Sequence, residues 1–575
     1  MAEGPTTLPG APDHRGFWSD LSQLFRTFQV ALDPRKVAVA AAGVLATALG
    51  WFLLSYVFYG MVGAKPERAD DTRYGNSVVR KQLPDKKADG KDYSEEDLRA
   101  EGDRVFLKDF NQWKVAHDLA GPNGRLRTLP WYEYRGPNPF LLFTSLVGGT
   151  AVDLETGFRQ FLSGTVPVLI EPLVKLLLPV VGLVSPDATF GTRIYLLLCL
   201  AWSVAVWAFF GGVITRIAVV QFAGKERVTL PEAVKFVASR YTSYALSPLV
   251  PLGVILAIVV AMALYGLLAL IPILGDLLLY GLGMPLVLFG GVAIAILLIG
   301  LVGYPLMYTT LSAEGSDTFD ALSRAYNYVF QAPWAYLGYG IAAILYGSLV
   351  TFFVVFLGSL SVYMGKWAVS QAPFSEQSNR RPDFLFLYAP ETFGWKEVLL
   401  KGSPIEVKPS VVVDPDTGRQ RVDYVPANPD TFARYKNDYT WWNYAGAGMT
   451  TFWMVLVLLL VIGFSYSYFW SASTLIYLLM RRKVDETEVD EIYTEDEFAD
   501  NPLPMPGTTT VSGPAAPGVS KLPTIEHTPA SAPSPAPAPL PPVAPPPVSV
   551  SPPPAPVQMD KPAEPAPKKP SDEAK

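Results

Sequence analysis

Glu226-Arg-Val-Thr-Leu-Pro-Glu-Ala-Val-Lys235 and Ser316-Asp-Thr-Phe-Asp-Ala-Leu-Ser-Arg324 are the two polar stretches that decide the predicted fold. Each joins two long apolar runs, and the chain returns to apolar sequence near Pro248 after the first and near Pro333 after the second. The segment 193–363 is therefore predicted to contain two copies of one unit. Each unit consists of an apolar span, a short amphipathic helix and a returning span.

Composition indicates a polytopic membrane protein with sizeable aqueous segments. Half of the 575 residues are apolar, and nearly charge-free runs alternate with blocks dense in Asp, Glu, Lys and Arg. The net charge of -6 argues against a nucleic-acid partner. One cysteine, Cys199, permits no disulfide within the chain, and three scattered histidines suggest no metal site. No cofactor is predicted.

Six membrane spans are predicted from hydropathy, and the first is an uncleaved signal anchor rather than a signal peptide. They cover residues 37–62, 193–213, 248–270, 285–311, 334–363 and 450–480. The fold class is thus an all-α, six-helix polytopic bundle. Small residues at Ala42, Ala46 and Gly50 either form a helix-packing face of the first span or serve as filler.

Lys and Arg fix the predicted orientation, because cytoplasmic segments of membrane proteins carry an excess of both. Both termini are placed in the cytoplasm, at the inner membrane of a bacterial cell. The cytoplasmic segments are 1–36, 214–247, 312–333 and 481–575, and the extracytoplasmic ones are 63–192, 271–284 and 364–449. The short outer loop 271–284 contains no Lys or Arg, as this orientation requires.

The two connecting stretches are predicted to form amphipathic elbows that lie on the inner leaflet or pack under the bundle. Thr229 and Glu232 have the spacing of a capping box, which starts the first helix. At the helical period of about 3.6 residues, the apolar side chains of each stretch fall in one narrow arc. The arcs comprise Leu230, Val234, Val237, Tyr241 and Tyr244 in the first helix, and Phe319, Leu322, Tyr326, Val329 and Phe330 in the second.

The segment 158–184 is ambiguous, because it is apolar but broken by three prolines. Glu171 and Lys175 stand four residues apart, so that both charges can share one water-facing side of a helix. One or two helices lying in the membrane interface are therefore favoured over a seventh span, although a crossing stays open.

The outer segments are predicted to form a small α+β layer. Residues 411–424 have the pattern of a β-hairpin, with two β-rich arms around Asp-Pro-Asp-Thr-Gly. The aromatic stretch 128–140 is either a partner-binding loop or, as favoured, a segment that lies at the lipid headgroups.

Two kinds of sequence follow the last span. Residues 484–500 contain nine acids and no base, so this stretch is expected to be solvated. Residues 501–575 hold 24 of the 53 prolines and are predicted to be a disordered tail. The tail either recruits a protein partner or acts as a spacer.

Three residues are candidates for function. Asp276 is the one acid in the apolar stretch 245–313, where an ionisable group is a functional candidate. A helix N-cap at the outer surface explains it equally well and is favoured. Arg240 and Arg324 precede a tyrosine at matching places in the two elbows and suggest gating or coupling, against the favoured alternative of passive elbows.

The doubled unit, with Phe319-Asp-Ala-Leu-Ser-Arg-Ala-Tyr-Asn-Tyr-Val-Phe330 and its return at Pro333, resembles uncharacterised bacterial multi-pass membrane proteins. It is loosely similar, over 190–365, to membrane domains of the Yip and glycerophosphodiesterase types. The catalytic domain of the latter has no counterpart, so the resemblance implies no activity.

The sequence lacks the common phosphate-binding, metalloprotease and serine-hydrolase motifs. A non-enzymatic membrane protein that organises or tethers partners is therefore predicted. The alternative is a transporter or channel subunit, with oligomeric state open.

Overall fold

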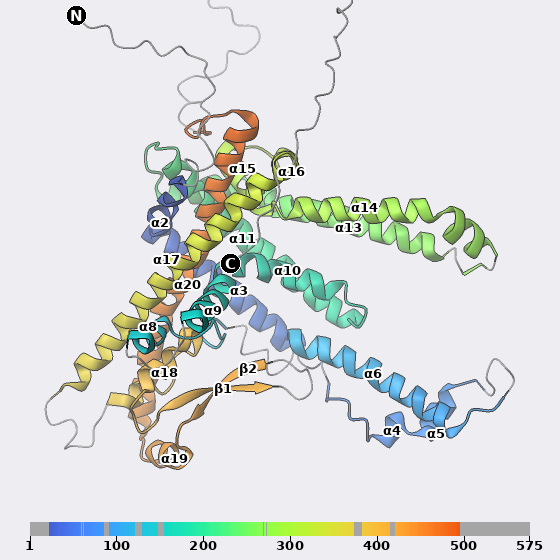
Figure 1. Ribbon diagram of the computed structural model, residues 1–575, viewed down its shortest axis with the longest axis horizontal. Helices are drawn as coiled ribbons and strands as arrows, with labels where there is room; N and C mark the ends of the chain where they lie inside the picture. The colour runs from blue at the N-terminus through green and yellow to red at the C-terminus, as the bar shows by residue number, and fades with distance from the viewer. Residues whose placement is uncertain are drawn as a thin grey trace, which may run out of the picture. The chain divides into compact units, whose positions relative to one another are not determined.

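Long helices dominate the part of the chain that the structure describes. The structure is a computed structural model, and it describes residues 22–58, 60, 63–84, 91–120, 129–147, 154–267, 270–271, 273–372, 382–413 and 420–494 (Figure 1). The Pro-rich tail, 501–575, lies outside these residues.

Six of the described helices are long and apolar enough to cross a membrane, as predicted from hydropathy. They are α3 (Pro34–Phe58), α11 (Phe190–Phe222), α13 (Tyr241–Leu267), α14 (Met284–Leu301), α17 (Pro333–Ser370) and α20 (Trp441–Asp485). Several extend well beyond the predicted spans, since α20 begins at Trp441 rather than at Thr450.

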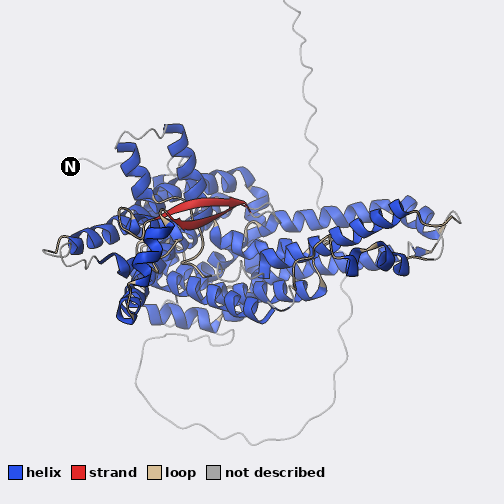
Figure 2. Cartoon of the chain, turned by 90° about the horizontal axis from the view of Figure 1, so that it is seen from below, coloured by secondary structure: helices blue, strands red, loops and turns tan. Residues whose placement is uncertain are grey.

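Shorter helices connect the long ones (Figure 2). Before α11 come α2 (Arg26–Ala31), α4 (Asp71–Tyr74), α5 (Asn76–Gln82), α6 (Glu95–Ala120), α8 (Pro139–Val147), α9 (Leu154–Leu169) and α10 (Glu171–Leu183). After it come α12 (Leu230–Ser239), the π-helix η4 (Leu274–Leu282), α15 (Tyr304–Glu314), α16 (Thr318–Gln331), the 3-10 turns η5 (Pro382–Phe386) and η6 (Thr392–Gly394), α18 (Trp395–Leu400) and α19 (Pro429–Asn437).

The helix α20 packs against both units of the predicted repeat, because it contacts α3, α11, α15 and α17. Its Trp470 is fully buried and stacks on Tyr308 of α15, with ring centroids 5.2 Å apart. A Cβ at Gly463 would lie 2.6 Å from the backbone oxygen of Val37, so α3 and α20 approach backbone to backbone. We call the end of the bundle that carries α12, α15 and α16 the elbow end (Figure 1).

The predicted fourth span, 285–311, is not one helix. Helix α14 ends at Leu301, and α15 begins at Tyr304 and is buried along almost its whole length. Pro305 in the first turn of α15 offers no N–H to a continuous helix, which favours a break at this point. A Cβ at Gly300 would overlap the ring of Tyr326, so the glycine also lets α16 approach closely.

The first elbow is shorter than predicted. The capping box is confirmed, since the Thr229 backbone N–H donates to Glu232 Oε2 at 2.8 Å. However, α12 ends at Ser239 with Arg240 as its C-cap, and a new helix, α13, runs from Tyr241 through Pro248 into the apolar segment. The predicted arc from Leu230 to Tyr244 is therefore divided between two helices.

The second elbow is a single helix, α16, capped by Asp317, whose side chain accepts from the Asp320 N–H at 2.9 Å. The face of α16 that packs inward overlaps the predicted arc only in part, since Val329 is buried and Tyr326 packs beside Gly300. Phe319 is 69% exposed and Phe330 45% exposed, whereas the buried side chains include Ala321, Ala325 and Tyr328. The small alanines allow close packing, and the two phenylalanines of the arc are left on the outside.

The predicted β-hairpin is confirmed and is longer than expected. Strands β1 (Val407–Val413) and β2 (Gln420–Pro426) pair antiparallel, with Val411 opposite Val422. The Asp-Pro-Asp-Thr-Gly turn lies outside the described residues. Next to the hairpin, Trp395 of α18 is buried and donates its indole N–H to Ser359 of α17 at 2.9 Å.

Candidate functional site

Glu171 and Lys175 are the charged pair that the sequence places on a water-facing helix side, and this prediction is wrong. The two helices α9 and α10 meet at a bend of 77°. At this bend Glu171 is only 8% exposed, and its carboxylate lies 2.6 Å from Lys175 Nζ. The i,i+4 spacing does bring the pair into contact, but other segments cover it.

The covering segment is the aromatic stretch that follows residue 128. Its Arg135 side chain forms two bonds with Glu171, Nε to Oε2 at 2.8 Å and Nη2 to Oε1 at 2.9 Å. Glu133 contacts Arg135 and lies 3.1 Å from Lys175 Nζ. Tyr466 of α20 donates its hydroxyl to Glu171 Oε1 at 3.1 Å. We call these five residues the central ionic cluster.

The central ionic cluster is electrically balanced, with two carboxylates facing two cations. Burial by itself lowers the pKa of Arg135, but the adjacent carboxylates of Glu133 and Glu171 outweigh this and hold the pKa above its usual value. Arg135 therefore stays charged. Such a cluster ties the 129–138 segment to α10 and α20, and the loss of one member would leave an unmatched buried charge.

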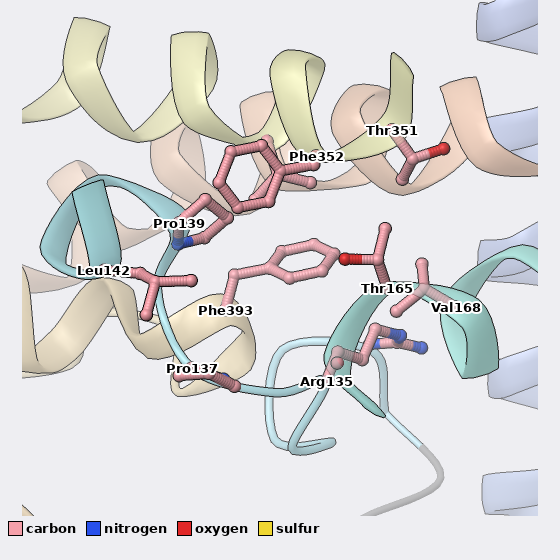
Figure 3. A pocket seen from close by; sticks show the side chains of 11 residues that line it. Arg135, Pro137, Pro139, Leu142, Thr165, Val168, Thr351, Phe352 and Phe393 are labelled. Carbon is pink, nitrogen blue, oxygen red and sulfur yellow. The ribbon is translucent and has the colours of Figure 1, made fainter. Parts of the chain in front are cut away.

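A small cavity lies beside Arg135 (Figure 3). Its volume is about 20 Å³, which is room for about one water molecule. Thr165 and Thr351 supply polar lining, and Phe352 and Phe393 supply apolar lining. The size excludes a substrate larger than water in this arrangement of the side chains.

A second group of charges lies at the elbow end and includes the candidate Arg324. Its guanidinium lies 2.8 Å from Glu314 and 3.1 Å from Asp320. Glu314 also accepts from Tyr477 at 2.7 Å and lies 3.3 Å from Arg481 Nε. We call Glu314, Arg324, Tyr477 and Arg481 the elbow cluster. It joins α15 and α16 to the end of α20.

In the described part of the acidic stretch, 484–494, the acidic residues are exposed, as the prediction of a solvated segment requires, but the backbone of its end packs against the bundle. Arg481 Nη1 donates to the backbone oxygen of Glu491 at 2.6 Å, and the Tyr493 N–H donates to the Ala313 oxygen at 2.7 Å. Ile492 is buried. Backbone groups, rather than the acidic side chains, make these contacts, which composition alone does not reveal.

The candidate Arg240 belongs to this same region. Its guanidinium lies 4.2 Å from the ring centre of Phe236, and its Nε donates to the Gly315 oxygen at 3.3 Å. Arg216 also lies over Phe236, at 4.0 Å, and donates to the backbone oxygens of Ser312 and Tyr493. In the sequence, Arg216 is one of the basic residues by which segment 214–247 is assigned to the cytoplasm. The contacts show that it also joins the two units.

Asp276 is not brought together with the two arginines. It lies exposed in the first turn of η4, between α13 and α14. The structure thus unites Arg240 and Arg324 at the elbow end and leaves the third candidate apart. Among the described residues, no group of three His, Cys, Asp or Glu side chains could hold a metal ion.

No protein family, curated protein or solved structure matches this chain. The similarity to Yip-type and glycerophosphodiesterase-type membrane domains stays a prediction that depends on the doubled architecture of residues 190–365. The clusters and surfaces of the chain itself are therefore the basis for inferring its function.

Proposed function

We propose that the chain is an integral protein of the bacterial cytoplasmic membrane, with six spans and both termini in the cytoplasm, and that it organises protein partners rather than catalysing a reaction. Helices α13 and α14 support the membrane placement. Only 6% and 11% of their most apolar windows are buried within the protein. A helix that exposes apolar side chains over most of its surface is stable when lipid covers it.

The single observation that carries the organising role is that α20 joins both charged clusters. Tyr466 bonds to Glu171 in the central ionic cluster, and Arg481 pairs with Glu314 in the elbow cluster. The 45 residues of α20 span roughly 67 Å at about 1.5 Å per residue, more than the ~30 Å of a bilayer core. The two charged clusters thus attach different segments of the chain to α20 at two well-separated places along its length.

This arrangement of helices suits a protein that presents surfaces to partners on both sides of the membrane. The outer layer contains the hairpin and α18, and the Pro-rich tail follows the elbow end in sequence. A proline-rich segment of this composition can be bound by domains that recognise extended proline-rich ligands.

The test is affinity purification of the full chain against a chain that ends at residue 500. We expect the truncated chain to stay in the membrane and to lose cytoplasmic partners. A matched control replaces residues 501–575 by a Gly/Ser linker of the same length, which keeps a spacer but removes the prolines. If all three chains retain the same co-purifying proteins, the organising role of the tail is wrong.

A transporter or channel subunit is the second candidate, and the central ionic cluster favours it. Buried ionisable groups in a membrane protein mark ion and proton pathways. Glu171 and Lys175 fit that description, whereas the exposed Asp276 does not. Proton or cation flux into liposomes that carry the wild type, but not the Glu171→Gln variant, would support transport over organisation. We expect no flux from either.

A further inference from the structure

A cleft of about 730 Å³ opens at the elbow end, between the junction of α2 with α3 and the loop that follows α11. The residues of its wall that matter here are Leu32, Asp33, Arg35, Gln221, Lys225 and Arg227. We call it the basic cleft. Its volume is of the order that holds a small molecule or a lipid headgroup.

Behind Gln221 lies the fully buried side chain of Lys36. Its Nζ donates to Gln221 Oε1 at 2.9 Å and to Ser471 Oγ at 3.3 Å, and both partners are neutral. The one carboxylate of the wall, Asp33, accepts from Gln221 at 2.6 Å and pairs with Arg35 at 2.8 Å. Asp33 therefore balances Arg35, and Lys36 reaches the lining of the cleft only through its hydrogen bond to Gln221.

Two further cations lie at the rim. Lys225 and Arg227 are exposed, and they follow Gly224, whose φ of +67° turns the chain sharply at the end of α11. The neighbouring Glu226 is exposed but does not line the cleft. Lys225 and Arg227 thus give the lining two positive charges beyond the balanced pair of Asp33 and Arg35.

Part of the lining is apolar. Leu32 is 43% exposed, and Val30 and Pro34 also line the cleft. A ligand that matches both the basic and the apolar residues of the lining carries a negative group next to an apolar portion. Inorganic phosphate provides the first and lacks the second, whereas a phospholipid provides both.

We propose that the basic cleft binds the phosphate of an anionic lipid headgroup, with the glycerol and first acyl carbons against Leu32. The position of the cleft fits a lipid headgroup, because the cleft lies at the ends of two spanning helices, where α3 begins and α11 ends. Basic pockets at the cytoplasmic ends of spanning helices are suited to anionic headgroups. The inference rests on the membrane placement proposed above, and deepens it by naming a lipid class.

The test uses the purified full chain in neutral detergent micelles, titrated with phosphatidylglycerol, phosphatidylcholine or inorganic phosphate. Binding is followed as the rise in Tm, because a ligand of the folded state stabilises it in proportion to its affinity. The test variant carries Lys225→Gln and Arg227→Gln. Its matched control carries Lys235→Gln and Lys483→Gln, two exposed residues that do not line the cleft.

We expect phosphatidylglycerol to raise Tm of the wild type and of the control, and phosphatidylcholine to leave it unchanged. The rim variant should bind phosphatidylglycerol roughly 30-fold more weakly, given the usual contribution of a basic residue near an anionic lipid. Equal responses of rim variant and control would overturn the proposal, as would inorganic phosphate that displaces the lipid. A chain released from membranes by carbonate would instead refute the membrane placement.

Discussion

The buried carboxylate of Glu171 pairs with Arg135 and Lys175 and accepts a hydrogen bond from the hydroxyl of Tyr466. Substitution by glutamine keeps the size and removes the charge, so Arg135 and Lys175 are left with Glu133 alone. We expect Glu171→Gln to lower the free energy of unfolding by about 3–5 kcal/mol. Denaturant titration in detergent measures it.

The control for this variant is Glu96→Gln, which removes an exposed carboxylate from the first turn of α6. It should change stability by less than about 1 kcal/mol. If the two variants were equally stable, Glu171 would not be the centre of a stabilising cluster.

Asp33 makes the elbow end sensitive to acid. Burial raises the pKa of Asp33, but hydrogen bonds from Arg35 and Gln221 outweigh this and lower it from 3.8 to about 2. Because the folded pKa lies below the unfolded one, the ionised carboxylate stabilises the fold above about pH 4. This contribution is lost as the pH falls toward 2.

The Asp33→Asn variant checks the sign. We expect it to unfold at a lower temperature than wild type between pH 5 and 7, as ionised Asp33 supports Arg35. The difference in Tm should shrink steadily below about pH 4. A difference that grows on acidification would contradict the assigned direction.

Residue by residue, sequence spacing predicted some local contacts and missed distant ones. The i,i+4 spacing of Glu171 and Lys175 placed them together, and they do pair. Arg135, however, stands 36 residues from Glu171 in sequence, and Tyr466 stands 295 away. Local sequence patterns give no sign of contacts between such distant residues. Glu171 and Lys175 were therefore predicted to face water.

At the scale of the element, the close approach of α3 and α20 depends on Gly463. An added methyl group would meet the backbone of Val37 and Ala41, and backbone cannot rotate away as a side chain can. We expect Gly463→Ala to lower the free energy of unfolding by about 1–3 kcal/mol.

Gly448, in the same helix, is the matched control, because a Cβ there meets nothing within 4 Å. Gly448→Ala should be neutral or slightly stabilising, since alanine is the better helix former. Equal losses at both positions would show that helix propensity rather than packing determines the effect.

Local signals also set the limit of what could be predicted about elements. The capping box at Thr229 and the hairpin arms depend on neighbouring residues, and both are confirmed. The helix ends at Ser239 and at Leu301 interrupt apolar sequence that has the periodicity of a longer helix. At the second break Pro305 supplies a local reason, and the packing of Tyr326 beside Gly300 adds one that lies outside the apolar pattern.

At the scale of the whole molecule, hydropathy predicted six apolar helices because that signal is a sum over many residues. The same sum says nothing of how the helices join, which depends on single residues such as Arg216 and Arg324. The contacts of the elbow cluster were therefore not predicted, although the sequence singled out Arg240 and Arg324 at that end.

The central claim is that the elbow end and the hairpin end lie on opposite sides of a membrane. In a Cys199→Ser background, Lys401→Cys near the hairpin and Lys483→Cys at the elbow end would each provide one exposed thiol. A membrane-impermeant maleimide applied to intact spheroplasts should label the Lys401→Cys chain at once and the Lys483→Cys chain only after permeabilisation. Labelling of both chains, or of the Lys483→Cys chain alone, before permeabilisation would contradict the account.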